Sequence, residues 1–134
     1  MNETSRQKLI EVIENNKSWP ILIKGVDSSF FGDAAVIPAT TPSAELGIIP
    51  NAGGYQVPQW LKTLESRKSE QYNFLVIDRI DEITQHDQMK FLEILKNKSI
   101  SGHKFPENTR IMLTVGDKSL VNKEVLANVI TWSV

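Results

Sequence analysis

Residues Phe74 to Ile77 form a short apolar run that stops abruptly at acidic side chains. A continuous apolar run of this length, bounded by charge, is typical of a strand buried on both faces, as in parallel sheets covered by helices. The acidic residues Asp78, Asp81 and Glu82 would then lie at the carboxyl end of that strand. Open α/β sheets bind their ligands at this end. The run therefore predicts an α/β domain and makes Asp78 a candidate metal ligand.

The composition narrows the class of protein further. The chain has 134 residues, of which 40% are apolar and 23% charged, as expected for one globular domain. A net charge of −1 provides no overall attraction for nucleic acid or an anionic membrane. The absence of cysteine excludes disulfides, thiolate catalysis and cysteine-bound zinc. The polar amino terminus and the lack of a run of about 18 apolar residues lead us to expect a cytoplasmic protein with no membrane association.

Other segments have the periodicity of strands and helices that alternate along the chain. Strands are predicted at residues 19–25, 35–37, 74–77, 110–116 and 129–134. Helices are predicted at residues 4–17, 59–68, 84–97 and 120–128, with Thr84 as a cap, and a turn or short hairpin at 99–106. This alternation predicts a parallel sheet with right-handed crossovers, flanked by helices.

The segment Gly25 to Asp33 occupies the place where a nucleotide-binding domain would have its phosphate loop. Such a loop has the form GxxxxGK[ST], so that backbone N–H groups and a lysine bind the phosphates. This segment has no lysine, no second glycine at that spacing, and two acidic side chains that would repel phosphate. Asp27 and Ser28 are instead predicted as turn or cap residues, and Phe30 and Phe31 as core residues.

Residues 34–58 contain four of the six prolines but only one charged side chain, Glu45. Proline at this density disfavours helix and confines any strand to a brief piece such as Ala35 to Ile37. Long irregular segments in compact domains are functional or mobile, and sparse charge argues against disorder. We therefore expect an irregular segment that packs against the protein's own sheet or against a partner.

Between about Ser18 and Val134, several segments together resemble the α/β core of AAA+ ATPases, most closely the MoxR-like branch. The resemblance rests on the order and spacing of five segments, at residues 47–50, 58–61, 74–78, 102–110 and 126–128. It implies a three-layer α/β domain of the P-loop NTPase kind, in which residues 74–78 form the Walker B strand. It also implies a single truncated domain, residues 1–134, that lacks the helical lid of the family.

The groups that hydrolyse ATP in this family are missing at the matching positions. The loop at Gly25 lacks the lysine, Arg79 follows Asp78 where the family has a glutamate, Gly116 replaces the sensor-1 asparagine, and Val129 replaces the arginine finger. An arginine finger alone contributes a factor of about 10³–10⁵ in rate. Arg79 cannot take a proton from water and is expected to pair with Asp78. We therefore expect no enzyme activity, no metal and no cofactor, with Gly25 and Asp78 as vestiges of the site.

The favoured hypothesis is a catalytically inactive, pseudo-ATPase domain that binds a protein, either an AAA+ ATPase or a second copy of itself. The predicted partner contacts are Pro50, Tyr55, His103, Lys104 and Phe105. One alternative is an ATPase-like protein that binds Mg·ATP in a site rebuilt from Asp27, Asp33, Asp78 and Asp81. A second alternative, a nucleic-acid-binding module, would use a basic patch of Lys98, His103, Lys104 and Arg110, although nucleic acid is not the expected partner.

Overall fold

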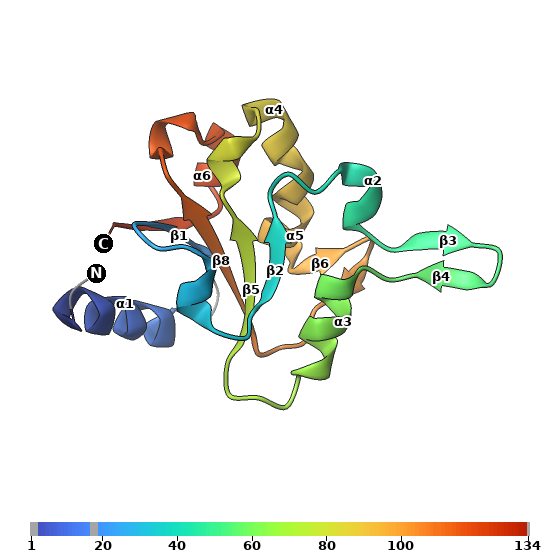
Figure 1. Cartoon of the computed structure of the whole chain (residues 1–134), viewed down its shortest axis with the longest axis horizontal. Helices are drawn as coiled ribbons and strands as arrows, with labels where there is room; N and C mark the ends of the chain where they lie inside the picture. The colour runs from blue at the N-terminus through green and yellow to red at the C-terminus, as the bar shows by residue number, and fades with distance from the viewer. Residues whose placement is uncertain (1–2, 17–18, 134) are drawn as a thin grey trace.

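Five parallel strands form the centre of the molecule in a computed structural model, which describes residues 3–16 and 19–133 (Figure 1). Their order across the sheet is β2-β5-β8-β1-β9. The strands are β1 (Ile21–Lys24), β2 (Ala35–Pro38), β5 (Asn73–Asp78), β8 (Thr109–Val115) and β9 (Ile130–Ser133). The predicted parallel α/β sheet is thus confirmed. Residues Lys17 and Val134, which were predicted to end a helix and a strand, lie outside the described residues.

Helices cover both faces of the sheet and give the fold three layers (Figure 1). On one face lies α1 (Glu3–Asn15), and Phe31 is buried in the same cluster with Phe30 partly buried beside it. On the other face lie α3 (Gln59–Ser66), α4 (Gln85–Gln88), α5 (Leu92–Asn97) and α6 (Lys123–Leu126). Leu75 and Ile77 of β5 face this second layer, whereas Val76 faces α1. The strand is therefore buried on both faces, as its uninterrupted apolar run predicts.

Two of the predicted helices are shorter and more divided than expected. The segment 84–97 forms α4, a 3-10 turn η3 (Met89–Phe91) and α5. Thr84 caps α4 as predicted, because its hydroxyl accepts the N–H of Asp87 at 3.1 Å. The segment 120–128 contains only α6, which follows a second 3-10 turn, η4 (Lys118–Leu120). No helix within the described residues is long and apolar enough to cross a membrane.

The segment 34–58 is ordered rather than irregular, so this expectation was wrong. After β2 it forms a short helix α2 (Ser43–Leu46) and a hairpin of β3 (Ile49–Asn51) and β4 (Gly54–Gln56) that extends away from the sheet (Figure 1). Pro42 occupies the N-cap position of α2, where its missing N–H is no cost. A second hairpin, β6 (Ser99–Ile100) and β7 (His103–Lys104), confirms the turn predicted at 99–106.

Candidate functional site

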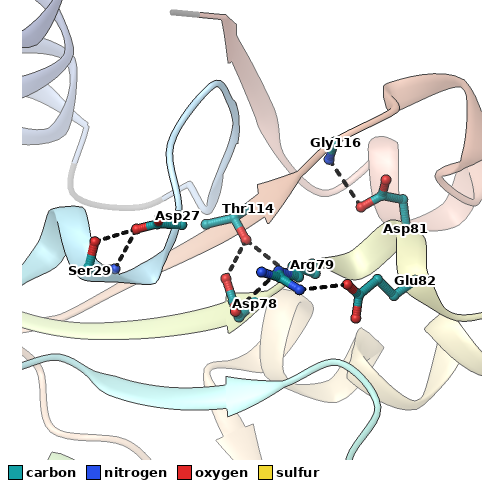
Figure 2. Close-up of polar contacts among 8 residues, drawn as sticks. All are labelled: Asp27, Ser29, Asp78, Arg79, Asp81, Glu82, Thr114 and Gly116. Atoms are coloured by element: carbon teal, nitrogen blue, oxygen red, sulfur yellow. Dashed lines mark hydrogen bonds and ion pairs between the residues drawn. The ribbon is translucent and has the colours of Figure 1, made fainter. Parts of the chain in front are cut away.

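The carboxyl ends of β5 and β8 bring a carboxylate, a hydroxyl and a guanidinium together (Figure 2). Asp78 is the last residue of β5, and its Oδ1 accepts a hydrogen bond of 2.7 Å from Oγ1 of Thr114 in β8. The same Thr114 oxygen accepts the N–H of Arg79 at 2.8 Å. Thr114 is only 2% exposed, so its hydroxyl is shielded from water. One oxygen of Asp78 is therefore already bonded within the protein.

Arg79 turns the chain out of the sheet in the left-handed conformation, with φ 62° and ψ 59°. Its Nη1 donates to Oε1 of Glu82 at 2.9 Å, whereas its Nε lies 4.0 Å from Oδ2 of Asp78 (Figure 2). The predicted pair with Asp78 is thus present, but Glu82 is the closer partner. The hydrogen bond to Glu82, together with the charges of both carboxylates, raises the pKa of Arg79. The guanidinium stays charged and cannot serve as a general base.

Asp81 closes the turn that follows β8. Its two carboxylate oxygens accept the N–H groups of Gly116 at 3.1 Å and Asp117 at 2.8 Å. A Cβ atom at Gly116 would lie 3.0 Å from Oδ2 of Asp81, which is closer than a side chain normally approaches. The carboxylate of Asp81 thus favours glycine at position 116. The end of β8 presents backbone here instead of a polar side chain.

The chain crosses from β1 towards β2 through a single 3-10 turn, η1 (Ser28–Phe31). Gly25 begins this loop with φ 103°. Asp27 caps the turn as predicted, because its Oδ1 accepts the Ser29 N–H at 2.9 Å and also the Ser29 hydroxyl (Figure 2). These bonds, the hydroxyl first, lower the pKa of Asp27. The chain after β1 is therefore a short turn that begins at an ionised carboxylate.

A hollow of about 260 Å³ lies between these three segments. Its lining contains no lysine, and its charged side chains are Asp27, Arg79, Asp81 and Glu82. Asp33 is not part of it, because its carboxylate is 91% exposed and lies 3.6 Å from Arg67. Among the described residues, no group of three or more His, Asp or Glu side chains is arranged to hold a metal ion. The hollow therefore has a net negative charge, and its carboxylates are bonded to groups of the protein.

Four of the residues predicted as partner contacts are exposed on the two hairpins. Pro50 in β3 lies opposite Tyr55 in β4, whose side chain is 73% exposed. His103 and Lys104 form β7, and both are exposed. The Nε2 of His103 lies 2.7 Å from Oε1 of Glu65 in α3. Because His103 is paired with a carboxylate, it is not available as one of the four basic residues of the predicted nucleic-acid-binding patch.

The fifth predicted contact, Phe105, is a core residue, so its prediction was wrong. It is only 8% exposed, and its ring packs edge-on against Trp60 of α3 with 5.7 Å between ring centres. Trp60 in turn donates its indole N–H to the carbonyl of Leu46 at 3.2 Å. Phe105 follows an exposed turn in the sequence and was therefore predicted to be exposed as well. Its ring is instead buried against Trp60.

The base of the β3–β4 hairpin is joined to the turn of the β6–β7 hairpin. Oγ of Ser101, in the β6–β7 turn, accepts the N–H of Ile48 at 3.1 Å. A Cβ at Gly47 would lie 2.5 Å from the same oxygen, so only glycine permits this approach. Glu93 of α5 holds the turn by accepting the N–H groups of Ser101 and Gly102, both at 3.0 Å. These contacts make the hairpins one structural unit.

Sequence reasoning did not single out Thr114 or Glu93. A signal for Thr114 was available, because it is the one polar residue in the apolar stretch Ile111–Val115. Glu93 offered none, since a glutamate on an amphipathic helix is ordinarily solvated. The hydrogen bonds to Gly102, Ser99 and Ser101 lower the pKa of Glu93. The carboxylate is therefore ionised at neutral pH, as its role at the turn requires.

Comparison with known proteins identifies the fold. No protein-family model matches the chain, and no curated protein matches it in sequence. Among solved structures, a DNA polymerase III gamma subunit-related protein from Thermotoga maritima is similar over 97% of this chain, with a TM-score of 0.54 and 15% identity. NtrX from Brucella abortus, solved in complex with ATP, is similar over 100% of this chain, with a TM-score of 0.55 and 14% identity.

The similarity reaches only part of these two proteins. This chain spans 45% of the first structure and 36% of the second, which is less than half of either. At 14–15% identity the likeness establishes the arrangement of strands and helices alone. Together with the five-stranded parallel sheet, it shows that the chain shares the α/β fold of the matching parts of these two proteins.

Proposed function

We propose that this chain is an AAA+-like domain that does not hydrolyse ATP and acts by binding another protein. The observation that carries the proposal is the acidic, internally bonded carboxyl edge of the sheet. Thr114 and Arg79 engage Asp78 there, and two backbone N–H groups engage Asp81. The carboxylates that could bind a nucleotide-bound metal ion are therefore already bonded to other groups of the same domain.

The charges oppose a bound triphosphate. Asp27 places an ionised carboxylate at the loop where phosphates would bind, and no lysine lines the hollow. Mg²⁺ would have to compete with the Thr114 hydroxyl and with Arg79 for the oxygens of Asp78. The residues present therefore do not fit Mg·ATP.

The joined hairpins are the candidate contact surface. Residues 46–58 carry no charge, and Tyr55 is 73% exposed near the tip of the β3–β4 hairpin. Exposed aromatic side chains on a rigid support are frequent anchors of protein interfaces. An active AAA+ ATPase or a second copy are the partners that the resemblance to the MoxR-like branch favours, and membership of that branch stays a prediction.

Nucleotide binding is tested by calorimetric titration with Mg·ATP and Mg·GTP. We expect no binding tighter than about 100 µM, which corresponds to about −5.5 kcal/mol, and no release of phosphate. Tighter binding or measurable turnover would favour the alternative of a rebuilt site at Asp27, Asp78 and Asp81. Titration with DNA at two salt concentrations tests the second alternative, since contacts to phosphates weaken steeply with salt.

Protein binding is tested by mixing the chain with purified AAA+ ATPases and following co-elution and ATP turnover. Tyr55→Ala should weaken any complex. Leu120→Ala is the matched control, because Leu120 is also an exposed large apolar residue, 48% accessible, but lies in η4 away from the hairpins. The proposal would be contradicted if no ATPase tested co-eluted with the chain or changed its turnover. Equal effects of the two variants would also contradict it.

A further inference from the structure

The strand β9 forms one edge of the sheet, at the end marked C in Figure 1. Ile130 lies opposite Ile21 of β1, and its N–H donates to the carbonyl of Pro20 at 2.9 Å. The N–H and C=O of one residue point to the same side of a strand, and successive residues alternate. The backbone N–H and C=O groups of Thr131 and Ser133 therefore point away from β1. On that side, no strand formed by the described residues pairs with β9.

This edge lacks the proline found on the opposite one, and the charge beside it is Lys118, whose Nζ lies 3.4 Å from the hydroxyl of Thr131. The N–H of Ala39 donates to the carbonyl of Asp78, so the outward residues of β2 are Val36 and Pro38. Pro38 has no N–H to offer a further strand. The sequence of β9, Ile-Thr-Trp-Ser, contains neither proline nor charge. Natural edge strands commonly carry such groups to prevent pairing with another chain, so β9 is competent to pair.

We infer that β9 pairs antiparallel with β9 of a second copy of this chain, about a two-fold axis. In the register that places Thr131 opposite Ser133 of the other copy, each such pair exchanges two hydrogen bonds. All outward N–H and C=O groups of the two residues are then satisfied. Trp132 meets Trp132 of the second copy at the axis, in a non-hydrogen-bonded position where side chains lie closest and aromatic pairs stabilise a sheet. The strand thus supplies both halves of the interface.

The helix α1 leaves room for this pairing. Leu9 and Ile13 are buried in one cluster with Ile21 and Ile23 of β1, and Trp132 of the edge strand packs, partly buried, at the margin of this cluster. The two α1 helices would be separated by three strand spacings, roughly 14 Å, which exceeds the interaxial distance of about 8–10 Å between packed helices. The groove between α1 and Trp132 is lined by Lys8 and Glu11, which face this gap. Because their charges are opposite, Lys8 can pair with Glu11 of the second copy.

Sedimentation velocity over a range of protein concentrations tests the dimer. Thr131→Pro removes an outward N–H and leaves the bonds to β1 intact, so the dissociation constant should rise at least roughly tenfold. Val36→Pro is the matched control, since it removes an outward N–H from the opposite edge and should leave the dissociation constant unchanged. Circular dichroism verifies that both variants fold. A monomer at every concentration up to about 1 mM, or equal effects of the two variants, would overturn the inference.

Engineered cysteines test the register, because the chain contains none of its own. Residues that form a hydrogen-bonded antiparallel pair have Cα atoms about 5.5 Å apart, within the range of disulfides. Thr131→Cys mixed with a tagged Ser133→Cys variant should give mainly the mixed disulfide under mild oxidation. Disulfides within each variant at equal yield, or no cross-link at all, would contradict this arrangement.

Discussion

Replacing Thr114 by valine tests whether one hydroxyl holds the carboxyl edge of the sheet together. Valine has nearly the same shape, but it removes both the bond to Asp78 and the acceptor for the N–H of Arg79. A hydrogen bond to an ionised group contributes about 1.5–3 kcal/mol, and a buried N–H left unpaired costs about 1–3 kcal/mol. Water can replace part of the first loss, because the Asp78 side chain is 20% exposed. We expect the free energy of unfolding to fall by about 3 kcal/mol.

Urea denaturation followed by circular dichroism at pH 7 measures this change. Thr131→Val is the matched control, because it makes the same substitution at an exposed position of β9 and should cost less than about 0.5 kcal/mol. In the double variant with Asp78→Asn, the two losses should fall short of additivity by about 1 kcal/mol, since the side chains share a bond. A Thr114→Val protein within about 0.5 kcal/mol of wild type would refute the bridge.

Four other substitutions test the site and the hairpins, and the same denaturation assay measures their effects on stability. Gly116→Asn places a Cβ 3.0 Å from Asp81, so it should cost about 1 kcal/mol. It should bring no affinity for ATP, and tight ATP binding would contradict this. Phe105→Ala should cost about 3 kcal/mol because the ring is buried, whereas Tyr55→Ala should cost under about 0.5 kcal/mol; equal costs would place Phe105 at the surface. The pKa of Glu93 is lowered, so the stabilisation by its charge is complete above its ordinary pKa of 4.5 and is lost as the pH falls further. Glu93→Gln should therefore lose less stability on acidification than wild type. Identical pH profiles of stability would refute the role of the charge.

The central strands were predictable because a strand that is buried on both faces has a continuous run of apolar residues in the sequence. An uninterrupted apolar run such as Phe74–Ile77 is expected where helices cover both sides of a sheet, as they do here. The cap residues Asp27 and Thr84 were predictable for a similar reason, since their hydrogen bonds reach only two and three residues along the chain. Local physics was sufficient in both cases.

The features that sequence missed depend on contacts between distant segments. The bridge from Thr114 to Asp78 joins residues 36 positions apart, and the bond between Ser101 and Ile48 joins residues 53 apart. The prolines also led to a wrong prediction, because Pro42 and Pro50 were expected to disrupt regular structure. Pro42 instead begins the helix α2, and Pro50 lies in the β3–β4 hairpin, which is not part of the central sheet. What decides their effect is whether an N–H is needed at that position.

The two proposed surfaces lie at opposite edges of the sheet, so a dimer through β9 would carry its two hairpin units outward (Figure 1). An oligomeric partner could then engage both units at once, and such bivalent binding can strengthen apparent affinity by up to about 10²–10⁴. Thr131→Pro should weaken binding to an oligomeric partner but not to a single isolated subunit of it, whereas Tyr55→Ala should weaken both. Surface plasmon resonance with each form of the partner in turn separates the two effects. If Thr131→Pro weakened binding to the isolated subunit equally, the β9 edge would itself contact the partner, and bivalency would not explain the affinity.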